Sequence, residues 1–118
     1  MWVYSVTAKT LWKNSGDVVT TRCSSGHDGA KDISQLDDMK DIGPIPRGTW
    51  QVLNGFDSMA IGAKTIPLLP LDHTAKKRAG FTLHGNMVKM HQANGIVMPL
   101  SVRDKIDKSK DRTMLVIE

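Results

Sequence analysis

Cysteine is nearly absent from this chain of 118 residues, which contains only Cys23. A single cysteine excludes an internal disulfide framework and any zinc site built from several cysteines. No run of about 18 apolar residues occurs, so we expect no membrane-spanning helix. A basic and then apolar leader with a small-residue cleavage site is also missing, so we expect no standard secretory signal. A protein of this kind that works outside the cytoplasm needs another export route.

Aromatic residues are also few, with three Trp, one Tyr and two Phe against sixteen Lys and Arg. The net charge of +4 favours an anionic partner, such as nucleic acid, acidic lipid or a cell-wall polymer. Binding nucleic acid by stacking requires exposed aromatic rings among the basic residues. Most rings here lie in strand-like runs, where we expect burial, so we expect no nucleic-acid partner. The densest basic run, at residues 76–78, is interpreted as a solvated loop.

Length and patterning predict one small domain over residues 1–118, since single domains most often contain roughly 100–150 residues. The predicted class is mostly β with minor α, a small sandwich or partial barrel with one or two short helices. Apolar alternation and β-branched residues predict strands at residues 2–7, 10–13, 18–23, 49–56 and 113–117.

Two further elements are predicted from local chemistry. Pro67 and Pro70 interrupt the apolar run at residues 66–71, which favours an edge strand because proline cannot donate to a ladder. Ser101, with Asp104 three residues later, predicts the start of a helix that reaches about residue 110.

Four short motifs lie in an order that is more informative than any one of them. They are S-S-G-H at residues 24–27, G-P-I-P-R-G at 43–48, F-T-L-H-G-N at 81–86 and H-Q-A-N-G-I-V-M-P at 91–99. A histidine that ends a strand before a glycine faces a loop, and histidine is the usual general base near neutral pH. His84 is therefore the first candidate for chemistry, with a structural strand-capping role as the alternative.

In this order the motifs resemble the Tlde1 domain family, L,D-transpeptidase-like proteins that include antibacterial effectors of type VI secretion. The resemblance covers nearly the whole chain, and G-P-I-P-x-G and H-G are its more specific elements. It implies a peptidoglycan target in the periplasm, delivery by a secretion machine and a cognate immunity protein as partner. The matching segments are W-V-Y at 2–4, S-G-H-D-G at 25–29, G-P-I-P-R-G-T-W at 43–50, G-F-T-L-H-G at 80–85, I-V-M-P at 96–99, S-V-R-D-K-I at 101–106 and D-R-T at 111–113.

The resemblance also implies roles for single residues. In the family a cysteine thiolate attacks an amide carbonyl of a peptidoglycan tetrapeptide stem, and the acyl group passes to a D-amino acid or to water. Here His84 would be the base, oriented by Gly85 or Asn86, and backbone amides around Asn94 and Gly95 would form the oxyanion site. Residues for stem-peptide binding would be Ser25, Gly26, His27, Asn86, His91 and Arg103. Arg103 would pair with a peptide carboxylate, or else be a surface arginine of the helix.

The family's nucleophile is missing from this chain. The cysteine position falls at Gly95, Ile96 or Asn94, depending on the residue on which the motif is aligned. Catalysis therefore stays open, and the alternative is an inactive relative that binds cell-wall peptides or a protein partner without turnover. Cys23, with His27 or His84 as its base, is a second possible nucleophile.

A zinc site is the remaining alternative for the scattered histidines. The possible ligands show no H-x-H or H-E-x-x-H spacing, so we expect neither a metal nor another cofactor. These possible ligands are His27, Asp28, His73, His84 and His91.

Overall fold

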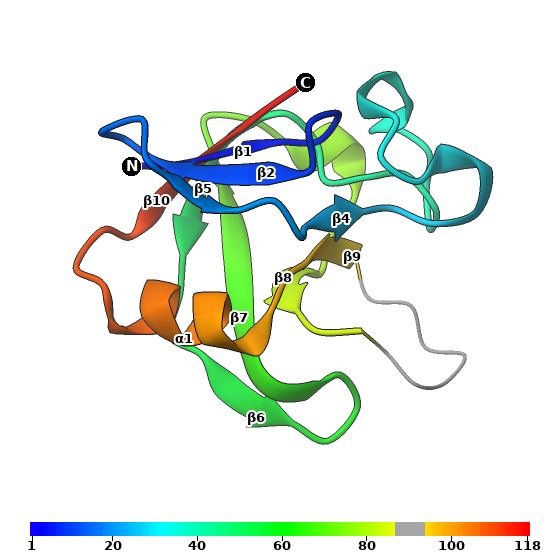
Figure 1. The fold of residues 1–118 in the computed structure, drawn as a ribbon. Coiled ribbons are helices and arrows are strands. Elements are labelled where there is room, and N and C mark those ends of the chain that lie inside the picture. The colour runs from blue at the N-terminus through cyan, green and yellow to red at the C-terminus, as the bar shows by residue number, and fades with distance from the viewer. Residues whose placement is uncertain (87–93) are drawn as a thin grey trace.

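The computed structural model describes residues 1–86 and 94–118, and these residues are mostly β with one α-helix, as predicted (Figure 1). The strands are β1 (Trp2–Ser5), β2 (Thr10–Lys13), β3 (Val18–Thr20), β4 (Ser24–Ser25), β5 (Gly48–Val52), β6 (Phe56–Ser58), β7 (Gly62–Leu71), β8 (Phe81–His84), β9 (Asn94–Val97) and β10 (Thr113–Ile117). The helix is α1 (Leu100–Lys108), and the 3-10 turns are η1 (Asp28–Ala30), η2 (Ser34–Leu36) and η3 (Ala75–Lys77).

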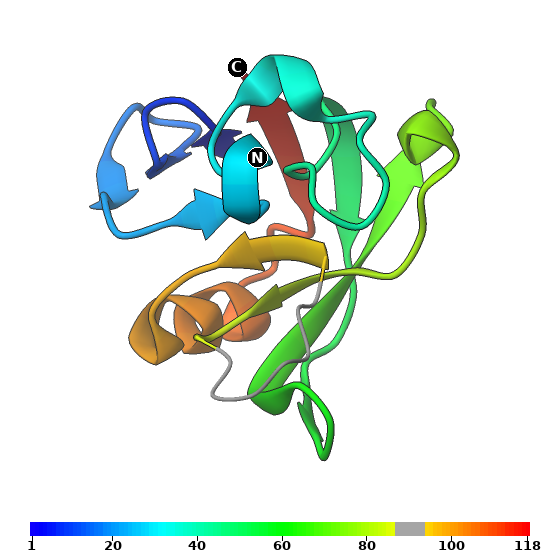
Figure 2. The same ribbon diagram turned by 90° about the vertical axis from the view of Figure 1, so that its right-hand side faces the viewer.

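The sheet is mixed, and its order is β3-β2-β1-β10-β5-β7-β8-β9-β4, with β6 paired to β7. The first and last strands, β1 and β10, pair in parallel, and so do β8 and β9. The sheet curves so that β4 and β9 lie across from β1 and β2, with α1 beside β7 and β8 (Figures 1 and 2). This arrangement agrees with the small sandwich or partial barrel expected from the sequence.

The core collects the buried aromatic and aliphatic side chains that the alternation of the strands predicts. Trp2 and Tyr4 of β1 are fully buried, and Trp50 of β5 packs edge-on against Phe81 of β8, with ring centroids 5.0 Å apart. Burial of such rings is the main favourable term in folding. Phe56 is an exception, since half of its side chain is exposed on β6.

The prediction that residues 66–71 form an edge strand is wrong. β7 is internal, and it changes partners along its length. Ile66 and Pro67 pair with β8, whereas the ladder with β5 begins at Leu68 and includes Pro70. Each proline therefore pairs with one neighbouring strand only. The N–H that a proline lacks is then not needed for a second ladder.

The predicted helix is present, but its predicted cap is wrong. α1 begins at Leu100 after Pro99, and no side chain caps it. Asp104 instead accepts a hydrogen bond from Lys108 (2.9 Å) and lies 3.6 Å from the ammonium of Lys64. Tertiary contacts with β7 have replaced the local capping pattern.

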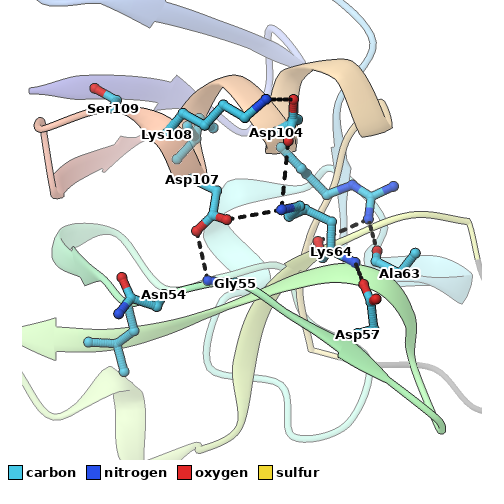
Figure 3. Close-up of polar contacts among 12 residues, drawn as sticks. Asn54, Gly55, Asp57, Ala63, Lys64, Asp104, Asp107, Lys108 and Ser109 are labelled. Atoms are coloured by element: carbon cyan, nitrogen blue, oxygen red, sulfur yellow. Dashed lines mark hydrogen bonds and ion pairs between the residues drawn. The ribbon is translucent and has the colours of Figure 1, made fainter.

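A polar network fastens α1 to β7 and to the segment before β6 (Figure 3). The carboxylate of Asp107 accepts a hydrogen bond from the amide of Gly55 (2.8 Å) and pairs with Lys64 (3.1 Å). The amide of Lys64 in turn donates to Asp57 (3.0 Å). The helix is thereby held against the long strand whose neighbour, β8, carries His84.

Candidate functional site

His84 ends β8 with its ring buried, only 3% of the residue being exposed. Its Nδ1 lies 3.2 Å from the carbonyl oxygen of Thr82 and 2.9 Å from the hydroxyl of the same residue. A hydrogen bond to the carbonyl places the proton on Nδ1, because a carbonyl can only accept, whereas the closer hydroxyl can either accept from Nδ1 or donate to it. Burial, with a smaller effect of Arg103, lowers the pKa of His84, against the opposing hydrogen bond to Thr82. The lowered pKa favours a neutral imidazole near neutral pH, and with the proton on Nδ1 the basic nitrogen of a general base would be Nε2.

Thr82 contacts the candidate base His84, and the sequence analysis did not single it out. Its hydroxyl lies between His84 Nδ1 and the carbonyl oxygen of Asn94, at 2.9 and 3.5 Å. Residues two apart on a strand share a face, so a polar residue two positions before a candidate base was a usable signal.

Gly95, the first of the three positions where the family pattern would place a nucleophile, has no room for a side chain. Gly95 pairs with Thr82, has φ +129°, and an added Cβ would lie 1.8 Å from the Thr82 carbonyl oxygen. At the other two aligned positions, Ile96 and Asn94, a side chain would not lie beside His84 either. Ile96 is fully buried in the core. Asn94 lies on the opposite face of the β8–β9 pair from His84, because aligned residues of parallel strands share a face.

Asn94 and the residues at 25–27 serve the scaffold. The Asn94 amide donates to the carbonyl of Ala79 (3.1 Å). Ser25 is 1% exposed, and its hydroxyl donates to the carbonyl of Gly95 and accepts from the amide of Ile45 (2.8 Å). Gly26, with φ +79°, lets the chain pass close to Pro44. These contacts lock the G-P-I-P loop to β9.

His27 is only partly buried next to this loop, with its amide donating to the carbonyl of Ile42 (2.9 Å). His91 lies outside the described residues, so its predicted role stays a prediction. Ser25, which the resemblance assigns to stem-peptide binding, has an enclosed side chain, so no binding groove is open at Ser25.

Arg103 and Gly85 lie close together, a contact that the sequence analysis did not predict. The Arg103 guanidinium is buried, with hydrogen bonds to the carbonyl oxygens of Met98 (3.1 Å), Ala63 (2.6 Å) and Lys64 (3.1 Å). Its Nη2 lies so near Gly85 that an added Cβ would be 2.8 Å away. Arg103 is thus a buried arginine of the inner helix face, and the alternative of a surface arginine is wrong.

A pocket of about 370 Å³ opens beside this arginine, at the end of the β8–β9 pair. We call it the arginine pocket, because Arg22 and Arg103 both line it and no acidic residue does. Arg22 is exposed, whereas Arg103 forms part of the buried wall. Within residues 1–86 and 94–118, the residues that line it are Arg22, Gly85, Asn86, Val97, Met98, Pro99, Leu100 and Arg103.

Cys23 is a buried thiol and has the wrong chemistry for a nucleophile. Burial, with the nearby negative charge of Asp32, raises the pKa of Cys23 to about 12. Only the thiolate attacks a carbonyl, and a pKa this high leaves almost none of it at neutral pH.

We expect Cys23 to resist a disulfide reagent in the folded protein. At pH 8 the native thiol should react with Ellman's reagent at least about 100 times more slowly than the same thiol in 6 M guanidinium chloride. Stopped-flow absorbance measures both rates. Native labelling as fast as that of the unfolded chain would reopen the case for Cys23 as the nucleophile.

The part of the chain that the structure describes was expected to hold neither a metal site nor a membrane-spanning helix. No group of three or more His, Cys, Asp and Glu side chains is placed to hold a metal ion within residues 1–86 and 94–118. No helix of these residues is long and apolar enough to cross a membrane.

The arginine pocket can therefore receive an anionic group, and His84 itself does not line it, although the next residue, Gly85, does. No protein-family model and no curated protein sequence matches this chain.

Proposed function

We propose that this domain binds the carboxylate-bearing ends of peptidoglycan stem peptides in the arginine pocket, as a Tlde1-like domain that performs no acyl transfer. The observation that carries the proposal is the pair of arginines, Arg22 and Arg103, around a pocket with no acidic lining residue. Arg22 is exposed and can bind a carboxylate with charge-assisted hydrogen bonds, whereas Nε and Nη1 of Arg103 are bound to carbonyls, so Arg103 contributes mainly its charge. A pocket of about 370 Å³ is at the lower end of the volumes typical of ligand sites, which suits one terminal residue of a peptide.

Three observations support binding without turnover. Gly95 has no room for a side chain, and Ile96 is enclosed in the core. Cys23 is a protonated thiol. The segment 87–93 has the sequence M-V-K-M-H-Q-A and contains no Cys, Ser or Thr. Covalent catalysis of the family's kind needs an activated nucleophile within reach of the base.

The setting of this activity follows from the resemblance alone. Under the proposal the target peptides lie in the periplasm, the protein reaches them by a secretion machine, and a cognate immunity protein protects the producing cell.

We expect Arg22→Glu to weaken the binding of a tetrapeptide-stem muropeptide. Reversing one of two pocket charges places a carboxylate against the ligand's carboxylate, and the affinity should fall at least about tenfold. Isothermal titration calorimetry at low salt measures the change. Arg22 is exposed, so the variant keeps its fold, and Lys31→Glu is the matched control because Lys31 is equally exposed and lies outside the pocket.

The ligand supplies a second control. A muropeptide whose terminal carboxylate is amidated should bind as weakly to the native protein as the free acid binds to Arg22→Glu. Equal affinity for acid and amide would refute carboxylate recognition. Mass spectrometry of the same mixtures tests turnover, and release of terminal D-Ala or exchange with an added D-amino acid would refute the inactive half of the proposal.

A further inference from the structure

The basic run at residues 76–78 is not a uniformly solvated loop. Lys76 and Lys77 are exposed, but Arg78 is only 9% exposed and its guanidinium lies against the ring of Phe81, 5.0 Å from the ring centroid. The run forms the turn η3 and the residue after it. The sequence interpretation therefore holds for the two lysines and is wrong for the arginine.

The turn that carries these residues is held in an unusual conformation. Ala75, Lys76 and Lys77 all have positive φ, at 52°, 54° and 61°, which is rare for consecutive residues other than glycine. His73 fixes the turn, since its Nδ1 accepts from the amide of Ala75 (3.1 Å) and its Nε2 donates to the carbonyl of Thr49 (2.9 Å). Such strain persists only where surrounding contacts impose it, and it concentrates at functional sites.

Arg78 is a buried cation that lacks a carboxylate partner in the described residues. Its Nη1 donates to the carbonyls of Asp37 (2.8 Å) and Pro44 (2.7 Å), and its Nη2 to the carbonyl of Gly43 (2.8 Å). Its Nε is buried without a hydrogen-bond partner. The carboxylate of Asp37, which could have neutralised it, is bound by Arg47 instead (3.0 Å).

A pocket of about 270 Å³ adjoins this arginine. Its lining includes three cations, Lys40, Lys77 and Arg78, and one carboxylate residue, Asp41. Asn94 and Ala79 complete it, and they are joined by a hydrogen bond of 3.1 Å from the Asn94 amide. We call it the lysine pocket, and it shares no lining residue with the arginine pocket.

We propose that the lysine pocket is a binding site for a phosphate group, with Arg78 as its fixed charge and Lys40 and Lys77 as its mobile ones. A buried charge is costly unless it is paired. A bound anion would supply the negative partner that the buried guanidinium of Arg78 lacks in the described residues. Burial lowers the pKa of Arg78 despite the opposing charges of Asp37, Asp41 and Asp38, and an anion would reverse that effect. This inference does not depend on the proposed recognition of stem peptides.

Phosphate fits the pocket better than a carboxylate does. The lining has three cations and one acidic residue, so it is net positive, although Asp37 and Asp38 also act on Arg78 from outside the lining. The Arg78 nitrogens Nη1 and Nη2 are already committed to carbonyls, so Arg78 contributes field rather than the bidentate fork that a carboxylate prefers. Lysine ammonium groups bind phosphate as point charges, and both lysines are exposed and free to turn inward.

The test is a titration of the ¹⁵N-labelled protein with inorganic phosphate at low ionic strength, followed by NMR. Saturable shifts are expected at the amides of Lys77, Ala79 and Asn94. Lys40→Gln and Lys77→Gln should each weaken binding at least about threefold, whereas the exposed controls Lys31→Gln and Lys110→Gln should not change it. Asp41→Asn should tighten binding about threefold, and Asn tolerates the positive φ of 71° at this position.

Two further arms identify the ligand. Acetate at the same concentration should cause at most weak shifts, and equal affinity for acetate would refute phosphate as the class. Vesicles containing phosphatidylglycerol separate the sources, since sedimentation with vesicles that depends on Lys77 assigns the phosphate to a lipid headgroup, and its absence assigns it to a soluble phosphate ester. Unsaturable shifts, or shifts that survive both lysine substitutions, would overturn the proposal.

Discussion

Replacing Gly95 by cysteine is expected to unfold the protein and not to create an enzyme. This change restores a thiol at one of the positions that the Tlde1 pattern assigns to the nucleophile. The added Cβ would lie 1.8 Å from the carbonyl oxygen and 2.7 Å from the nitrogen of Thr82, both of them backbone atoms that cannot move aside. The φ of +129° adds strain for any residue with a side chain. We expect Gly95→Ala and Gly95→Cys each to lose at least about 3 kcal/mol of unfolding free energy, measured by guanidinium denaturation.

Two other glycines separate the causes. Gly16 has φ +93° with nothing within 4 Å of an added Cβ, so Gly16→Ala should show the cost of the backbone conformation alone. Gly29 has open space and an ordinary φ, so Gly29→Ala should be nearly neutral. Gly95→Ala should lose more unfolding free energy than Gly16→Ala. An equal loss would show that β8 and β9 are not in close steric contact at Gly95.

Arg47→Met should cost about 2 kcal/mol at pH 7 and make the protein more sensitive to acid. Asp37 is 2% exposed and accepts hydrogen bonds from Arg47 Nε (3.0 Å), Nη2 (3.4 Å) and backbone amide (3.1 Å). Burial alone would raise the pKa of Asp37, but the hydrogen bonds and charge of Arg47 outweigh it and hold that pKa below its usual value. Removing the guanidinium leaves a buried carboxylate with its amide donor only, and the cost is below that of a fully buried pair because Arg47 is 37% exposed.

The pH dependence has a definite sign. Because the pKa of Asp37 is lowered in the folded state, its stabilising effect is complete above its unfolded pKa of about 4 and is lost as the pH falls through the lower, folded value. Asp37→Asn should remove this part of the acid transition. The lowered pKa of His84 also favours unfolding in acid, but at higher pH, near the ordinary pKa of histidine.

Thermal melts of the native protein, Arg47→Met and Asp37→Asn from pH 3 to pH 8 measure these effects. Lys31→Met is the control for loss of an exposed cation. An Arg47→Met profile that parallels the native one at every pH would show that Arg47 does not set the charge state of Asp37.

The strands were predictable wherever the local pattern and the final burial agree. Trp2 and Tyr4 alternate with less apolar residues and are buried, and the β-branched residues at 113–117 form β10. The failures are β7, the start of α1 and the ends of two strands, since the runs predicted at residues 18–23 and 49–56 end at Thr20 and Val52. Proline within an apolar run indicates an edge when each strand keeps the same neighbours, and β7 does not. Ser101 with an acidic residue three positions later is typical of a helix cap. In the structure, however, the carboxylate of Asp104 pairs with Lys64 and Lys108.

The candidate site was predictable in part. His84 and Gly85 were singled out because a strand that ends in His-Gly is a local signal, but the contact between Gly85 and Arg103 is visible only in the structure. Ser25 looked like a pocket residue because small polar loops often are, yet its hydroxyl is consumed by Gly95 and Ile45. Arg22 and Arg78 gave no local signal, since an isolated arginine is usually on the surface.

The sequence by itself determined the mostly β class, a short helix close to residues 101–110 and the single cysteine, because each of these depends on composition or on residues near one another in the chain. Only the tertiary structure decided what the charged residues do. Arg78 lies 35 residues from Gly43, and Arg103 lies 40 from Ala63, so their partners are backbone carbonyls that no sequence pattern marks. Burial turned these two ordinary arginines into fixed charges at two pockets, because a guanidinium enclosed by carbonyls keeps its charge and cannot move away.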